Sequence, residues 1–135
     1  MYKISKKEYS RLRDRAKKAQ RIDQSEVCGA LISSKNEFLG LEFLKNYSVN
    51  GCSFEISVDE LKKLRKSLMN KSEKVVGLFH SHPISEAIPS KRDIDESPLN
   101  RLMLIYDVCG LEARLYRIIG NKTNKKPKIL DLQIC

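Results

Sequence analysis

Residues 75–93 read VVGLFHSHPISEAIPSKRD, and this stretch holds both histidines of the chain. The apolar run before His80 predicts a buried strand, which should end at Pro83 because proline cannot donate to a β-ladder. Side chains two residues apart on a strand share a face, so we expect His80 and His82 to point to one side and Ser81 to the other. The strand therefore presents two imidazole nitrogens to a common point.

A third ligand for a metal ion is available after a short loop, at Asp93. Catalytic zinc is commonly held by three protein ligands with water in the fourth position, and a carboxylate suits the third place. The same aspartate forms an S-x-x-D pattern with Ser90, which on its own is typical of a helix capping box. Its presence within fourteen residues of the only two histidines favours a zinc site made by His80, His82 and Asp93.

Hydrolysis at such a site also needs a carboxylate base, which takes a proton from water and passes it to the leaving group. Glu26 lies far upstream, at the head of an apolar stretch, and three other acidic residues lie close to the histidines in sequence. Spacing alone leaves the choice open. The three nearby candidates are Glu86, Asp95 and Glu96.

The length of 135 residues suits one domain with its own core, so we expect residues 1–135 to fold as a single domain. No apolar run approaches the roughly 20 residues that a membrane span needs. The opening residues MYKISKK lack the apolar segment of a secretory signal. These features predict a cytoplasmic protein without a membrane partner.

The net charge of +9 is concentrated at the two ends of the chain. Residues 1–21 contain nine Lys or Arg against two acidic residues, and residues 117–135 contain five against one. A basic helix or tail of this kind can bind nucleic acid or an acidic protein face. We favour a solvated lysine-rich surface and regard nucleic acid as an unlikely partner.

The four cysteines lie far apart, without a C-x-x-C pair, which argues against a zinc ribbon, a redox motif or a disulfide framework. We expect free thiols at Cys28, Cys52, Cys109 and Cys135. Cys28 and Cys109 stand in apolar surroundings and are predicted to be small core residues, whereas the terminal Cys135 should be exposed.

Two capping boxes and the spacing of apolar residues predict the secondary structure. Ser5 with Glu8 marks the start of one helix, and Ser57 with Glu60 marks a second that runs to about residue 70. Strands are expected at 27–32, 38–44, 53–56, 75–82, 101–108, 112–119 and 128–134, with a turn at 33–36. This order predicts an α/β (α+β) fold, in which helices flank a single mixed β-sheet.

The chain resembles the JAMM metalloproteases, also called the MPN or JAB family, whose motif is H-x-H followed after seven residues by S-x-x-D. Residues 80–93 match that spacing without a gap. The family also has a glutamate upstream, in a segment like E-V-C-G-L-L, and residues 26–31 here read EVCGAL. The resemblance implies the MPN/JAB (cytidine-deaminase-like) architecture and selects Glu26 as the catalytic base.

The resemblance also implies a role for each motif residue. His80, His82 and Asp93 would hold one Zn²⁺ per chain, Glu26 would transfer the proton, and Ser90 would donate a hydrogen bond to the oxyanion. With only a few residues between Asp93 and the next strand, the long insertion of some eukaryotic members is absent, and no second zinc is expected. The chain is similar to a minimal, prokaryotic-type member.

Members of this family cleave peptide or isopeptide bonds after the C-terminal glycines of ubiquitin-like β-grasp proteins. The resemblance therefore implies a zinc isopeptidase that acts on such a modifier or its conjugates. One alternative is a peptidase that processes a sulfur-carrier precursor or adduct. Another is a non-catalytic binding or scaffold protein, or a nucleic-acid-associated relative that uses its basic ends. The sequence leaves the oligomeric state open.

Overall fold

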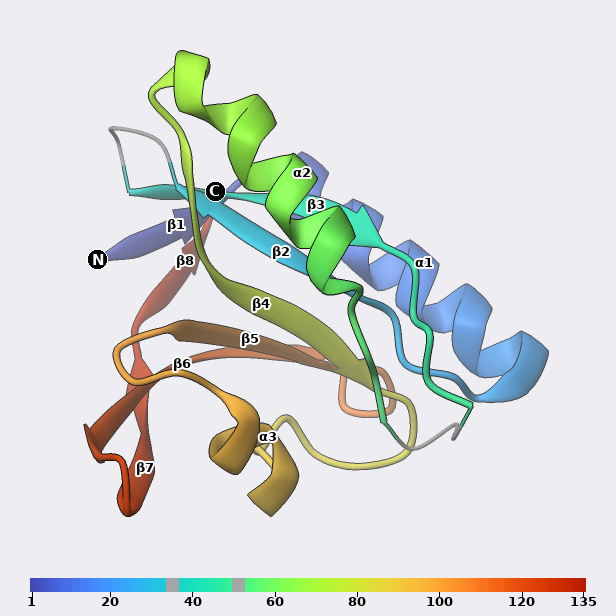
Figure 1. Cartoon of the computed structure of the whole chain (residues 1–135). Coiled ribbons are helices and arrows are strands. Elements are labelled where there is room, and N and C mark those ends of the chain that lie inside the picture. Colours follow the sequence, from blue (N-terminus) through green and yellow to red (C-terminus); the bar gives the residue numbers. More distant parts are fainter. Residues whose placement is uncertain (34–36, 50–52) are drawn as a thin grey trace.

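The computed structural model describes residues 1–33, 37–49 and 53–135 (Figure 1). The turn expected at 33–36 and Cys52 therefore fall largely or wholly outside the described residues. The helices are α1 (Lys6–Asp23), α2 (Val58–Leu68), the 3₁₀ turn η1 (Met69–Lys71) and α3 (Lys91–Glu96). The strands are β1 (Tyr2–Ile4), β2 (Cys28–Ser33), β3 (Phe38–Leu44), β4 (Lys74–His82), β5 (Leu102–Asp107), β6 (Glu112–Asn121), β7 (Asn124–Leu130) and β8 (Leu132–Ile134).

These eight strands form one mixed sheet in the order β7-β6-β5-β4-β2-β3-β1-β8, which confirms the predicted fold class. Strand β4 is central, antiparallel to β2 and parallel to β5. The strands β7 and β8 lie at opposite ends of this order although only Asp131 separates them in the chain. The sheet therefore curls until its two edges approach each other (Figure 1).

Helices cover the two faces of the sheet with different sets of apolar residues. Leu12 and Ala16 of α1 pack against Leu31, Phe79 and other buried residues on one face. On the opposite face, Leu68 of α2 packs with residues of β2 and β4. The loop that follows β4 packs on this second face as well, through Ala87. The alternation of side chains along each strand thus separates an α1 face from an α2 face.

The predicted helix starts are confirmed, but the first cap differs in detail from a capping box. The Ser5 hydroxyl oxygen accepts from the Glu8 N–H at 3.1 Å. The Glu8 carboxylate does not complete the box; it accepts from the Leu41 N–H at 2.9 Å and forms an ion pair with Arg11 at 2.6 Å. Glu8 therefore ties α1 to the sheet as well as to its own helix.

Three sequence predictions about the strands and one about a cysteine are wrong. Residues 53–56 form no strand, and the Asn46 side chain instead bonds to the backbone of Ser53 and Glu55. The last strand divides at Asp131 into β7 and β8, which pair with different neighbours. Strand β1 was not predicted. Cys109 is exposed rather than in the core, while Cys28 is buried and Cys135 exposed, and all three are free thiols.

A β-bulge in β4 decides which of its residues face the site. Leu31 of β2 pairs with Gly77, yet the next residue, Ile32, pairs with Val75, so Val76 is the extra residue. The bulge shifts the alternation by one, which places Val75 on the α2 face together with Leu78. No helix in the described part of the chain has both the length and the apolar character needed to cross a membrane.

Candidate metal centre

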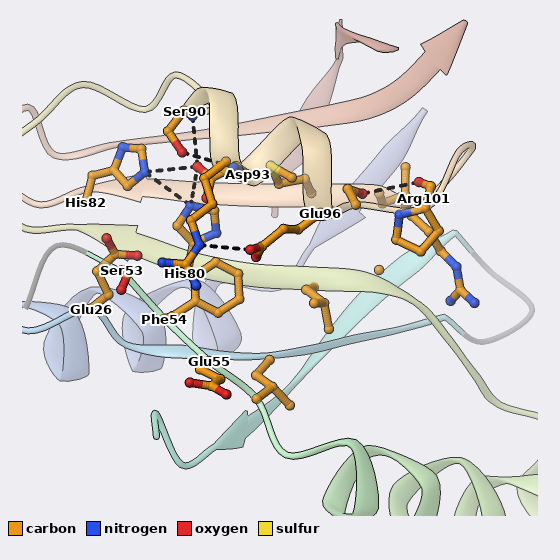
Figure 2. Close-up of a pocket in the computed structure, with 18 of the residues that line it drawn as sticks. Glu26, Ser53, Phe54, Glu55, His80, His82, Ser90, Asp93, Glu96 and Arg101 are labelled. Carbon is orange, nitrogen blue, oxygen red and sulfur yellow. Dashed lines mark hydrogen bonds and ion pairs between the residues drawn. The ribbon is translucent and has the colours of Figure 1, made fainter. Parts of the chain in front are cut away.

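The two histidines at the end of β4 point to the same side of the sheet, as predicted, and meet the carboxylate of Asp93 (Figure 2). The Nε2 atoms of His80 and His82 are 3.1 Å apart. Oδ2 of Asp93 lies 3.2 Å from Nε2 of His80 and 3.6 Å from Nε2 of His82. The three ligand atoms lie within 4.8 Å of one another, which makes them a group that could hold a metal ion.

The N-terminus of α3 supplies the carboxylate through a capping box. The Ser90 hydroxyl accepts from the Asp93 N–H at 3.0 Å, and Asp93 Oδ2 accepts from the Ser90 N–H at 2.9 Å. Oδ2 of Asp93 therefore takes part both in the helix cap and in the contacts with the two histidines. The capping pattern and the metal-ligand pattern are therefore not alternatives here, because the cap fixes the carboxylate that faces the histidines.

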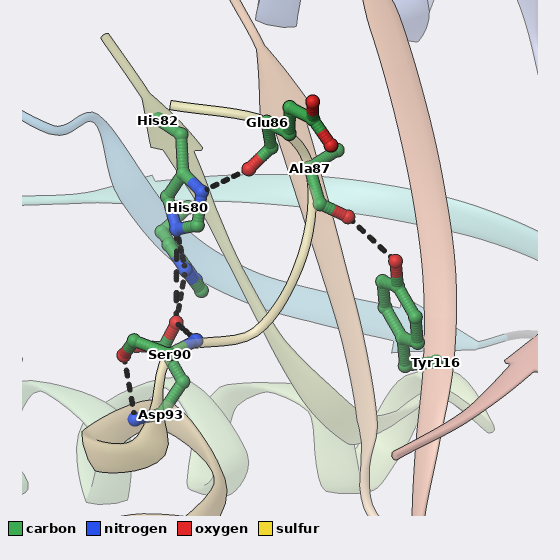
Figure 3. A network of polar contacts seen from close by, with 7 residues as sticks. All are labelled: His80, His82, Glu86, Ala87, Ser90, Asp93 and Tyr116. Atoms are coloured by element: carbon green, nitrogen blue, oxygen red, sulfur yellow. Dashed lines mark hydrogen bonds and ion pairs between the residues drawn. The ribbon is translucent and has the colours of Figure 1, made fainter. Parts of the chain in front are cut away.

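Hydrogen bonding fixes the tautomer of one histidine. Nδ1 of His82 lies 2.6 Å from the carbonyl oxygen of Glu86 (Figure 3). A carbonyl oxygen can only accept, so Nδ1 carries a proton and Nε2 is the nitrogen of His82 that faces Asp93 and His80. This is the usual outer-shell arrangement of a metal-binding histidine.

The other histidine is held by packing. His80 is completely buried, and its ring stacks on Phe54 with centroids 4.5 Å apart. Nδ1 of His80 has no hydrogen-bond partner among the described residues. Burial lowers the pKa of His80, which favours the neutral imidazole that a metal ion requires.

The carboxylate of Asp93 stays ionised in this environment. Burial works to raise its pKa, but hydrogen bonds from His80 and His82 and from the Ser90 N–H hold the pKa of Asp93 well below its usual range. For His82, burial works to lower the pKa, and the hydrogen bonds to Asp93 and Glu86 reverse that effect and raise it. Two imidazole nitrogens and one carboxylate oxygen form a donor set that suits zinc.

Glu26 lies beside this group because of the register between β2 and β4. Cys28 pairs with His80, and the pairing continues through Val27 and Ser81. The Ser81 N–H donates to the Val27 carbonyl oxygen, and the Val27 N–H donates to the Ser81 hydroxyl oxygen, both at 2.9 Å. One further residue along places Glu26 next to His82. Ser81 itself is buried and its hydroxyl accepts from the Val27 N–H, so it secures the segment that carries Glu26.

The Glu26 side chain is shielded from solvent, with only 7% of the residue exposed. Burial raises the pKa of Glu26 to about 7, with His82 opposing the rise and Asp93 adding to it. A carboxylate with a pKa near neutrality can both accept and release a proton at physiological pH. Glu26 is buried, whereas Glu86, Asp95 and Glu96 are exposed to solvent.

Asn46 organises the wall of the site opposite α3, and the sequence analysis missed it. Its side-chain amide donates to the carbonyl oxygens of Glu26 at 3.0 Å and Ser53 at 3.2 Å. Its Oδ1 accepts from the N–H groups of Ser48 at 2.9 Å and Glu55 at 3.0 Å. All four hydrogen-bonding positions of the amide are used. Asn46 thereby joins the base-bearing end of β2 to the segment that carries Phe54.

Phe54 and Tyr116 were also missed, since neither belongs to a recognisable motif. Phe54 was assigned to a strand, whereas it stacks on His80 from an irregular segment. Tyr116 stands on β6, far away in sequence, and supports the loop after β4 (Figure 3). Long-range contacts of this kind leave no local signal.

These side chains open onto a cleft of about 1060 Å³ between α2 and α3. All five residues predicted for the site line it, and they come from three places: the segment before β2, the end of β4 and the N-terminus of α3. They are Glu26, His80, His82, Ser90 and Asp93.

Comparison with known proteins agrees with this architecture. The family model of prokaryotic homologs of the JAB domain matches residues 5–119. A desampylase from Pyrococcus furiosus is 34% identical over 70 residues, which are 52% of this chain and 50% of that protein. The match thus spans about half the length of this relative.

Solved structures share the fold over nearly the whole chain at low sequence identity. A protein from Desulfitobacterium hafniense superimposes with a TM-score of 0.77, at 18% identity, over 100% of this chain and 93% of the other. A JAB1/MPN domain protein from Archaeoglobus fulgidus gives 0.61, at 20% identity, over 98% and 97%. A structure of the JAMM metalloprotease-like zinc site in the proteasome and signalosome gives 0.58, at 19% identity, over 100% and 98%. With the family match over residues 5–119, the chain belongs to the JAMM/MPN family, among the prokaryotic homologs of the JAB domain.

Proposed function

We propose that this protein is a zinc-dependent isopeptidase that cleaves after the C-terminal glycines of a ubiquitin-like β-grasp modifier. The observation that carries the proposal is the buried carboxylate of Glu26, with a pKa near 7, beside the ligand atoms of His80, His82 and Asp93. The similarity to a desampylase supports the substrate class. We also propose that the protein acts in the cytoplasm.

His80, His82 and Asp93 would hold one zinc ion per chain. The Nδ1 hydrogen bond of His82 leaves Nε2 to bind a divalent cation, and Asp93 is ionised. Because the pKa of His82 is raised, cation binding would release a proton from Nε2. When bound, zinc supplies Lewis acidity, which polarises a carbonyl group and lowers the pKa of a water molecule.

Glu26 would act as the general base and then as the general acid. With a pKa of about 7, its carboxylate can take the proton from the attacking water and deliver it to the departing amine. Its exposed fraction of 7% also limits competing proton exchange with bulk solvent.

Ser90 would stabilise the negative charge that develops on the substrate carbonyl oxygen. Its hydroxyl oxygen already accepts from the Asp93 N–H, so the hydroxyl proton remains available to a second acceptor in the cleft. Removal of one such donor typically costs about 10²- to 10³-fold in kcat.

The direct test uses the zinc-loaded protein and two substrates built on one β-grasp modifier. One substrate is a linear fusion through the terminal Gly-Gly, and the other joins the same Gly-Gly to a lysine side chain. We expect cleavage after the second glycine, with the isopeptide preferred. Preference for the linear fusion would instead favour a processing peptidase for a sulfur-carrier precursor.

The Glu26→Gln variant should retain zinc and lose cleavage, because glutamine cannot shuttle a proton. Glu42→Gln, an exposed glutamate on β3, is the matched control and should leave cleavage intact. If the purified protein contained no zinc and gained no activity when zinc was added, the proposed enzymatic function would be wrong, and a role as a non-catalytic scaffold would be favoured.

A further inference from the structure

The cleft extends well beyond the metal centre, along β4 toward the start of that strand. Val75, Leu78 and His80 line it, and the bulge at Val76 is what puts all three on the same face. Val75 pairs with Ile32 of β2 and His80 pairs with Cys28, so the bulged segment between them spans four ladder steps, or roughly 13 Å. An extended peptide lying along this floor from the reacting bond would cover the distance with about four residues.

Two arginines stand at this far end. Arg101 donates from Nη1 to the carbonyl oxygen of Val75 at 3.4 Å, and Figure 2 shows it at the end of the cleft away from His82. Arg65 lies on α2 one turn before Leu68, and Leu68 packs against Val75. Both arginines line the cleft, Arg65 from α2 and Arg101 from the residue before β5.

The charges of the cleft are divided along its length. The acidic residues Glu26, Glu55, Glu86 and Asp93 line the end of the cleft near the metal centre. The one other arginine of the lining, Arg92, is paired with Glu96 at 3.0 Å. In contrast, neither Arg65 nor Arg101 forms an ion pair within the described residues. The far end therefore offers two guanidinium groups that lack a carboxylate.

We infer that the cleft selects a modifier tail that carries an aspartate or glutamate about four residues before the scissile bond. This inference rests on the proposed function, which places an extended glycine-ended tail in the cleft. A guanidinium group pairs with a carboxylate through two parallel hydrogen bonds, so Arg65 and Arg101 recognise an acidic side chain better than a neutral one. A lysine at the same position meets like charge and is rejected.

The test measures binding of product-like peptides, which need no cleavage. Ten-residue peptides ending in Gly-Gly carry Asp, Ala or Lys at one of the positions three to seven residues before the last glycine. Fluorescence anisotropy with the wild-type protein should show the Asp peptide binding roughly tenfold more tightly than the Lys peptide, with the largest ratio near position four. The ratio should shrink as salt is added.

Charge reversal on α2 identifies the responsible residue. Arg65→Glu should invert the preference, so that the Lys peptide binds more tightly than the Asp peptide. Lys66→Glu is the matched control, because it makes the same charge change on the adjacent exposed residue, which does not line the cleft. Arg101→Gln, checked for an unchanged thermal unfolding midpoint, should reduce the ratio without inverting it.

Equal binding of the three peptides by the wild-type protein would overturn the inference, as would an equal response to Arg65→Glu and Lys66→Glu. These outcomes are separate from failure of the proposed function, which is measured by zinc content and by cleavage of the modifier fusions. A protein that cleaves fusions but ignores the acidic position would keep the function and lose this specificity.

Discussion

The hydroxyl of Tyr116 donates a hydrogen bond of 2.6 Å to the carbonyl oxygen of Ala87, and this contact joins strand β6 to the loop after β4 (Figure 3). Both residues are buried, and Ala87 packs in the same apolar cluster as the tyrosine ring. The neighbouring carbonyl oxygen, that of Glu86, accepts from Nδ1 of His82. Tyr116 therefore acts as a positioning residue for His82, through one intervening peptide.

The Tyr116→Phe substitution keeps the packed ring and removes only the hydroxyl. The Ala87 carbonyl would then be buried without a partner, which costs about 1–3 kcal/mol and loosens the loop. We expect zinc affinity to fall by about tenfold, at the lower end of the effect of an outer-shell change. Competition with a chromophoric chelator measures the affinity, and ¹⁵N NMR of the histidines reports the Nδ1 proton of His82.

Tyr2→Phe is the control for Tyr116→Phe. It removes a tyrosine hydroxyl that accepts from Arg117 at 2.7 Å, away from the cleft. A comparable loss of unfolding free energy with unchanged zinc affinity is expected. If both variants lowered zinc affinity equally, Tyr116 would contribute to the stability of the fold and would have no specific role in positioning His82.

Asn46→Asp tests the hub that joins Glu26 to the segment carrying Phe54. Aspartate keeps the acceptor for the Ser48 and Glu55 N–H groups but loses both donors, so it faces the carbonyl oxygen of Glu26 with like charge. We expect kcat for modifier cleavage to fall with KM less affected, because the base moves while the cleft remains. Near-normal kcat in a correctly folded variant would contradict this role.

The sequence predicted the site better than its surroundings, and the reason is the range of the contacts. His80, His82, Ser90 and Asp93 are close in sequence. The two-residue alternation of a strand and the three-residue spacing of a helix capping box suffice to predict that they come together. Glu26 required the family resemblance, since its place depends on the register of β2 against β4.

The parts that could not be predicted depend on partners distant in sequence. Residues 53–56 have the apolar pattern of a strand, yet the Asn46 side chain takes the place of a neighbouring strand. The division of the last strand at Asp131 follows from the curl of the whole sheet, which brings β8 to β1. The bulge at Val76 is likewise a property of two paired strands, and local periodicity does not report it.

Zinc should stabilise the fold, because its proposed ligands belong to two separate elements, β4 and α3. A ligand present at one hundred times its Kd adds about 2.7 kcal/mol to the unfolding free energy. For a chain of this size we expect the thermal midpoint to rise by roughly 10 °C. Calorimetry of the chelator-treated protein with and without zinc measures the shift.

Two controls belong to the zinc experiment. Magnesium at the same concentration should have little effect, since two of the three ligand atoms are imidazole nitrogens. His80→Ala should remove the response to zinc whatever its effect on basal stability. An identical midpoint with and without zinc in the wild type would contradict the proposed ligand set.

The raised pKa of Glu26 makes the stability of the zinc-free protein depend on pH. Its pKa rises from 4.5 to about 7 on folding, so the folded state binds the proton more tightly than the unfolded state. The stabilisation is fully present below pH 4.5 and is lost as pH rises through 7, with a total change of about 3 kcal/mol.

Glu26→Gln carries no titrating group, so it should match the wild type near pH 4.5 and exceed its unfolding free energy at pH 8. Urea denaturation of both zinc-free proteins at the two pH values measures the difference, and contributions from Asp93 and the histidines largely cancel. A gap between variant and wild type that stayed constant across this range would show that the pKa of Glu26 does not rise on folding, and its assignment as a proton carrier poised near neutrality would fail.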